Sequence, residues 1–143
     1  MNKMYNRDIL FRGKQVSNCD WIEGYVFPQC IDGGYAPLCI TTEPICANDY
    51  SEILGNWAVV DSSTVGQYTG LTDKNGKKIF EGDIIQGIYN LTGELIIGYV
   101  EYYQQATRYS VHSNDNIVGL YQCRNIKVIG NIHDNPELLE ECK

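Results

Sequence analysis

Short runs of aromatic and β-branched residues, separated by turn-forming residues, limit the fold of this chain more than any other feature. Such runs favour strands, and no segment has the apolar period of a helix longer than about three turns. The Asn75-Gly76 dipeptide is the strongest hairpin signal. The sequence therefore predicts a mainly all-β protein. We expect strands within residues 7–14, 21–27, 35–41, 56–61, 77–80, 83–89, 94–103, 107–112 and 126–132.

Several of these predicted strands contain a glycine. Gly24, Gly87 and Gly98 lie inside strands, where a glycine indicates a bulge or the close approach of another backbone. Gly98 is at the centre of the longest run, which is apolar on both faces. Strongly bent small barrels use central glycines in this way, so we expect a small β-barrel.

The chain is long enough for one domain or two small lobes. Residues 42–56 are irregular, and we divide the chain into an N-terminal β-rich part, 1–62, and a barrel part, 63–143, which could form one compact domain. A short helix should end the barrel part. Asn135 is a good N-cap, Pro136 suits the first helical position, and Leu138 can pack back onto the strands.

The formal net charge of −7 argues against non-specific binding to nucleic acid, because attraction to phosphate supplies most of that affinity. A basic face can still exist on an acidic protein. Lys74, Lys77 and Lys78 form one cluster, which we interpret as solvated lysines of a turn and an edge strand.

The six cysteines do not indicate a disulfide framework or a zinc site. No Cys-x-x-Cys pair occurs, and the N-terminal segment has no apolar region typical of a secretory signal. We expect a cytoplasmic location, with reduced cysteines that act as small buried apolar residues and a thiol in the C-terminal tail at Cys142. No apolar stretch approaches the length of a membrane span, so we expect no membrane partner.

The segment from Thr64 to Ile85 superficially suggests phosphate or calcium chemistry. Gly66 and Gly70 are four residues apart, but no lysine follows Gly70, so the segment is not a phosphate-binding loop. Asp73, Asn75 and Gly76 depart from the spacing of a calcium loop. We expect the Asp73 side chain to accept backbone N–H groups within a turn.

Residues for catalysis are also sparse. Glu81 and Asp83 could form a carboxylate pair, but at the entry to a strand we expect them to be solvated and turn-forming. His112 should point outward from its strand, and His133 should be exposed or cap the terminal helix. The sequence predicts no enzyme activity, no cofactor and no metal site.

The aromatic residues are a larger set of candidate binding residues. Exposed aromatic rings on a small barrel can stack bases or anchor a peptide. We expect most of them in the core or in a subunit interface. The members of this class are Trp21, Tyr25, Tyr68, Tyr99, Tyr102, Tyr103, Tyr109 and Tyr121.

Three segments together resemble the YopX-like family of bacteriophage and prophage proteins: RDILFRGK with the later WIEGYVF, then TVGQYTGLTDKNGKKIFEGDII, and finally VIGNIHDNPELL. Their order and spacing match from near residue 7 to residue 139. The resemblance implies an SH3-like barrel, expression inside a bacterial cell, and no catalytic residues. The motif residues are Thr64, Gly66, Gln67, Tyr68, Thr69, Gly70, Leu71, Asp73, Gly76, Phe80, Glu81, Gly82 and Asp83.

Taken together, these features predict a non-enzymatic interaction or assembly module that self-associates and binds a host or phage protein. The alternative is a nucleic-acid-binding small barrel, which the acidic charge disfavours. An enzyme that uses Glu81, Asp83 or a histidine is the third hypothesis. The candidate interaction surface comprises Tyr68, Thr69, Asp73, Lys74, Lys77, Lys78, Glu81 and Asp83.

Overall fold

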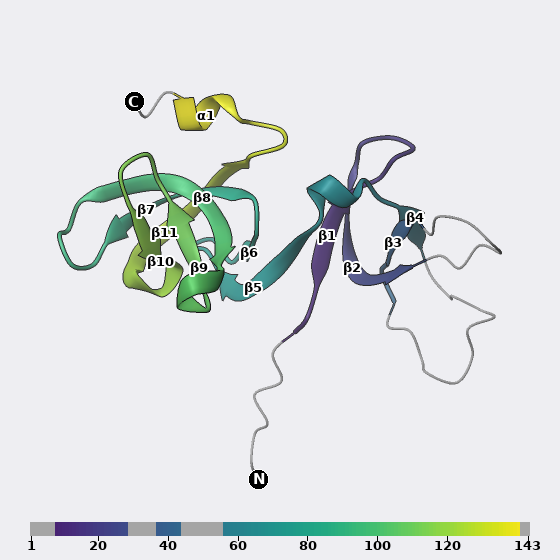
Figure 1. Ribbon diagram of the computed structural model, residues 1–143, viewed down its shortest axis with the longest axis horizontal. Coiled ribbons are helices and arrows are strands. Elements are labelled where there is room, and N and C mark those ends of the chain that lie inside the picture. The colour runs from purple at the N-terminus through teal and green to yellow at the C-terminus, as the bar shows by residue number, and fades with distance from the viewer. Residues whose placement is uncertain (1–7, 29–36, 44–55, 141–143) are drawn as a thin grey trace, which may run out of the picture. The chain divides into compact units, whose positions relative to one another are not determined.

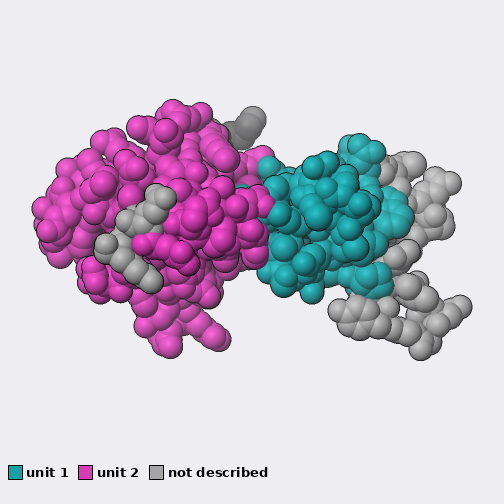
Figure 2. Space-filling view, turned by 90° about the horizontal axis from the view of Figure 1, so that it is seen from above, with its two compact units in different colours: residues 1–68 teal, residues 69–143 magenta. Residues whose placement is uncertain are grey.

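The computed structural model describes residues 8–28, 37–43 and 56–140, which fold almost entirely as antiparallel strands (Figure 1). The predicted all-β class is confirmed. The chain divides into two compact units, Met1–Tyr68 and Thr69–Lys143, which Figure 2 distinguishes by colour. The division lies inside a strand rather than at the predicted boundary between residues 62 and 63. Whether the two units are separate domains stays a prediction.

The first unit is an antiparallel meander in which each strand pairs with the next. A 3-10 turn, η1 (Ser62–Thr64), follows the meander and leads into β5, whose first residues pair with β1. The strands are β1 (Phe11–Lys14), β2 (Trp21–Pro28), β3 (Leu38–Thr41), β4 (Trp57–Val59) and β5 (Gly66–Thr72).

The motif residue Thr64 joins the two ends of this meander. Its hydroxyl donates to the Asp61 carbonyl at 2.6 Å and accepts from the Lys14 N–H at 2.9 Å. A bridge between Gln15 and Val60 lies beside these bonds. The chain after β4 is therefore tied to the end of β1.

The second unit contains a five-stranded antiparallel sheet in the order β10-β9-β8-β7-β11, preceded by a hairpin of β5 and β6. Two 3-10 turns, η2 (Gln104–Ala106) and η3 (Leu120–Gln122), connect its strands. The elements are β6 (Lys78–Phe80), β7 (Asp83–Tyr89), β8 (Leu95–Tyr103), β9 (Arg108–His112), β10 (Ile117–Gly119), β11 (Cys123–Asn131) and α1 (Glu137–Glu140).

One face of this sheet forms the core of the second unit. Ile79 of β6 and Ile85, Val100 and Val111 of the sheet are completely buried. Burying such a side chain stabilises a fold by about 1.5–3 kcal/mol, so this cluster accounts for much of the unit's stability. The other buried members of the cluster are Ile96, Val118, Leu120, Cys123 and Val128.

The small β-barrel expected from the sequence is not closed, because the five-stranded sheet stays open between its edge strands β10 and β11. The reason lies on the outer edge of β11, which bonds to the β5–β6 turn. The Ile126 carbonyl accepts from the Lys74 N–H at 2.8 Å, and the Val128 N–H donates to the Asp73 carboxylate at 3.0 Å. Register shifts within β11 further interrupt regular pairing.

The predicted C-terminal helix is confirmed as the single turn α1. Asn131 organises the approach to it, because its side-chain oxygen accepts from the N–H groups of His133 and Asp134 at 3.0 and 2.9 Å. The Asn135 carbonyl accepts from the Leu138 N–H at 3.1 Å. No helix in the described ranges has the length and apolar character that crossing a membrane requires.

The cysteines only partly match the expectation. Cys39 and Cys123 are buried thiols, and burial raises the pKa of Cys123. Cys19 is instead exposed, in a turn where its φ angle is 63°. Cys30, Cys46 and Cys142 lie outside the described residues.

Gly98 allows β9 to approach β8 closely. A Cβ atom at position 98 would lie 2.4 Å from the His112 carbonyl oxygen, whereas one at Gly87 would lie 3.3 Å from its nearest atom, the Arg124 carbonyl oxygen. We expect Gly98→Ala to lower the free energy of unfolding by about 2–3 kcal/mol, and the matched control Gly87→Ala by less than about 1 kcal/mol. Urea denaturation of both variants measures the difference. Equal losses would contradict a specific close approach at Gly98.

Candidate functional site

The motif around Asn75-Gly76 folds as a hairpin whose turn is organised by Asp73. One carboxylate oxygen of Asp73 accepts from the N–H groups of Asn75 and Lys77 at 2.8 and 3.0 Å. The backbone adds a bond from the Asp73 N–H to the Lys77 carbonyl, and Gly76 has a φ angle of +80°. The predicted role of Asp73 as a turn acceptor is therefore confirmed.

The second carboxylate oxygen of Asp73 reaches across the unit to the Val128 N–H of β11 at 3.0 Å. Burial by itself would raise the pKa of Asp73. The N–H groups of Val128, Asn75 and Lys77, together with the positive charge of Lys77, outweigh burial and hold the pKa below its ordinary value. Asp73 is therefore a buried anion that joins the hairpin to the edge of β11.

β11 is shaped to receive this turn. Its pairing with β7 shifts between Arg124 and Lys127, and Asn125 in the shifted segment has a left-handed φ angle of 51°. Asparagine tolerates this conformation better than most residues. The shift coincides with the bond from the Lys74 N–H to the Ile126 carbonyl, so the turn and β11 lie side by side.

The second turn of the motif is also structural. One carboxylate oxygen of Asp83 accepts from the Phe80 N–H at 2.8 Å, and Asp83 is only 1% exposed. Gly82, with φ of +85°, donates to the Val100 carbonyl and accepts from the Ile132 N–H. Glu81 accepts from the Tyr102 N–H at 3.4 Å. The expected solvation of Asp83 is wrong, because its carboxylate is built into the turn.

The eight residues of the candidate interaction surface therefore fall into two groups. The side chains of Lys74, Lys77 and Lys78 are exposed, and Glu81 is half-buried. The others are buried, and the Thr69 hydroxyl donates to the Ile79 carbonyl at 2.8 Å. The buried members are Tyr68, Thr69, Asp73 and Asp83.

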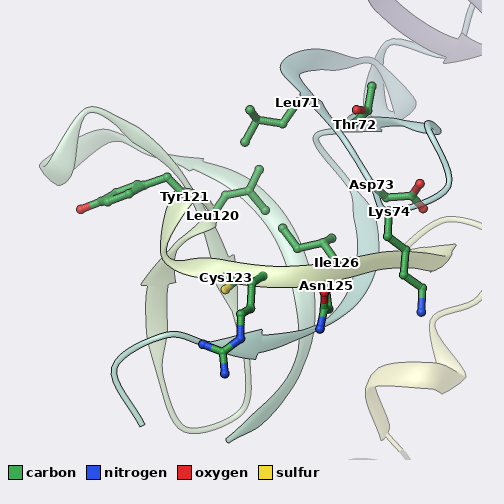
Figure 3. Close-up of a pocket in the computed structure, with 10 residues that line it drawn as sticks. Leu71, Thr72, Asp73, Lys74, Leu120, Tyr121, Cys123, Asn125 and Ile126 are labelled. Carbon is green, nitrogen blue, oxygen red and sulfur yellow. The ribbon is translucent and has the colours of Figure 1, made fainter. Parts of the chain in front are cut away.

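A groove of about 430 Å³ lies between the β5–β6 hairpin and the segment from η3 into β11 (Figure 3). Leu71, Leu120 and Ile126 form its apolar centre, and Lys74 lies at the hairpin side. The other polar residues of the lining are Thr72, Asp73, Arg124 and Asn125. A surface groove of this kind suits a ligand with both apolar and anionic parts.

Tyr121 is the most exposed aromatic side chain along this groove, with 65% of its surface accessible. The Arg108 guanidinium carbon lies 5.7 Å from the centre of its ring, and an Arg108 nitrogen donates to the Tyr121 hydroxyl at 3.3 Å. Gly119 makes room for the ring, because a Cβ atom there would lie 2.6 Å from it. The sequence identified Tyr121 as one of several aromatic residues that could bind a partner, but strand patterns could not show that its side chain is exposed.

The histidines do not join this groove. His112 is half-buried rather than outward-facing, and its ring stacks on Tyr99 at 5.2 Å between centroids. One His112 nitrogen lies 3.8 Å from the Glu101 carboxylate. His133 is half-buried in the turn before α1. Within the described ranges, no group of three or more His, Cys, Asp or Glu side chains could hold a metal ion.

Comparison with known proteins supports the resemblance seen in the motifs. The family model described as YopX protein matches residues 11–140. The chain belongs to the YopX family. The match covers both units and includes every motif residue from Thr64 to Asp83.

Among solved structures, this YopX family member is similar to the crystal structure of protein EF1440 from Enterococcus faecalis. The two share 28% sequence identity, and the TM-score is 0.53. The similarity covers 94% of this chain and 99% of that chain. A search of curated proteins found no match.

Asp73→Asn tests the connection between the turn and β11. An amide has one oxygen, so it cannot accept from both the turn N–H groups and Val128, and its NH₂ group would face a donor. We expect the free energy of unfolding at neutral pH to fall by about 1–3 kcal/mol in urea denaturation. The matched control is Asp115→Asn, at an exposed position in the β9–β10 turn. This substitution should change the free energy of unfolding by less than about 0.5 kcal/mol.

The pH dependence follows from the lowered pKa of Asp73. Its contribution to stability is complete above the unfolded-state pKa of about 3.9 and is lost as the pH falls through the lower folded-state value. The stability difference between wild type and Asp73→Asn should therefore shrink in acid. A difference that stays constant from neutral pH down to pH values below about 3 would contradict this assignment.

Proposed function

We propose that this YopX family member is a non-enzymatic interaction module, encoded by a phage or prophage and acting in the cytoplasm of its bacterial host. The observation that carries the proposal is that the motif carboxylates accept hydrogen bonds from the backbone. Asp73 and Asp83 are buried, and backbone N–H groups occupy oxygens of both. Carboxylates that serve as turn acceptors are poorly placed for proton transfer to a substrate. The accessible surface beside them consists of lysines and apolar groups.

The proposal includes self-association, which the exposed edge strand β10 supports. β10 pairs with β9 on one side and forms the end of its sheet. Ile117 of β10 is 46% exposed, and an edge strand with an exposed apolar residue is a natural template for another strand. A second copy of the chain, or a host or phage protein, would cover this edge.

Charge segregation in the second unit favours nucleic acid as a second candidate partner. Residues 71–80 and 120–131 contain five lysines and arginines and one acidic residue, the buried Asp73. Residues 81–119 and 132–140 contain eight acidic residues and one cation, Arg108. The net charge of −7 therefore conceals a local excess of cations in the β5–β6 hairpin and in the segment from η3 through β11.

Light scattering across a range of protein concentrations tests self-association. We expect a mass above the monomer value of 16.2 kDa, and we expect Ile117→Lys to weaken the association at least about tenfold by placing a charge on the edge. Leu95→Lys is the matched control, because Leu95 is 62% exposed but lies on β8 inside the sheet order. A monomer at every concentration, or equal effects of the two substitutions, would remove β10 self-association from the proposal.

A further inference from the structure

We propose that the groove beside Tyr121 binds single-stranded nucleic acid, with a base stacked on Tyr121 and phosphates bound by Lys74 and Arg124. This inference rests on the proposed interaction module and names one partner and its site. The groove combines exposed cations and an exposed aromatic ring, and the one carboxylate among the described residues that line it, Asp73, is buried.

The two cations of the groove lining, Lys74 and Arg124, have no acidic partner among the described residues. Both side chains are exposed, and no carboxylate in the described parts of the chain lies within ion-pair distance of them. Arg124 donates only to a neutral group, the Asn90 side-chain oxygen, at 3.2 Å. In a chain with excess acidic residues, such a group of cations is suited to an anion from outside the chain.

The backbone holds these cations in a fixed arrangement. The Lys74 N–H donates to the Ile126 carbonyl of β11, and the Val128 N–H donates to Asp73, so Lys74 of the hairpin and Arg124 of β11 belong to one hydrogen-bonded structure. Asp73 also lines the groove, but its oxygens face three N–H groups rather than a ligand. Its charge is further offset by nearby Lys77.

Tyr121 favours an unpaired base as the apolar part of the ligand. Its ring is 65% exposed and lies over the Arg108 guanidinium, which supports it from one side. The Nε atom of Arg108 is buried and has no hydrogen-bond partner among the described residues. Bases in a duplex are already stacked on each other, whereas a single strand can place a base on an open tyrosine ring.

The apolar centre of the groove continues from this ring. Leu71 is 44% exposed, and Leu120 and Ile126 lie between it and the β11 side in Figure 3. The Asn125 amide at the same edge can donate and accept hydrogen bonds with a base. The groove therefore provides stacking, apolar contact and phosphate binding within one unit.

Fluorescence anisotropy with a labelled thymidine oligonucleotide at low salt tests the proposal in the full chain. We expect Tyr121→Ala to weaken binding about 5- to 150-fold, and Tyr121→Phe, which keeps the ring, to bind within about twofold of wild type. Tyr102→Ala is the matched control, because Tyr102 is 44% exposed on β8 outside the groove, and it should leave the affinity unchanged.

The phosphate contacts are tested separately by salt dependence. Lys74→Ala and Arg124→Ala should each reduce the slope of log affinity against log salt by about 0.7, the value for one single-strand phosphate. Both side chains are exposed, so these two variants decide the question even if Tyr121→Ala fails to fold. Thermal melting of every variant separates lost binding from lost structure.

Three results would overturn the proposal: no oligonucleotide binding at low salt, unchanged binding by Tyr121→Ala and both cation variants, or tighter binding of the matching duplex. Saturable binding of polyglutamate without binding of the oligonucleotide would also overturn it and would assign the groove to an acidic protein. Self-association through β10 is measured independently. If self-association is observed but the oligonucleotide does not bind, the proposed interaction module is retained and only this nucleic-acid site is rejected.

Discussion

The second unit depends on the hydrogen bonds that the buried carboxylate of Asp73 accepts. It accepts two N–H groups from its own turn and a third from Val128, 55 residues further along the chain. A buried charge is stable only when such donors surround it. Because the third donor belongs to β11, the hairpin covers the edge that a closed barrel would have paired with β10. The position of the hairpin against β11 therefore accounts both for the open sheet and for the groove.

The same interaction explains why a motif with the appearance of a phosphate or calcium loop is mainly structural. Gly76 and Gly82 provide positive φ angles, Thr69 and Asp83 bond to backbone groups, and Phe80 packs into the interior. The motif leaves its lysines at the surface, and the Lys74 N–H bonds to Ile126 of β11. Structural residues of the motif thus position the groups that we propose to contact a partner.

Much of the fold could be predicted because its signals are local. Strand composition, the Asn75-Gly76 turn and the residues before α1 each act within a few positions. The bond from Val128 to Asp73 and the shifted pairing of β11 depend on contacts distant in the sequence, so a local pattern could not show the open sheet. The exposure of Tyr121 likewise depends on η3 turning the chain after Gly119.

Amide hydrogen exchange at Val128, followed by NMR in the full chain, tests most directly whether Asp73 fixes the turn to β11. The account predicts that the Val128 amide exchanges as slowly as the buried core amides of Ile85 and Val111, because its bond breaks only when the unit opens. Exchange as fast as that of an exposed turn amide, such as Asp115, would contradict a bond from Asp73 that holds the turn to β11.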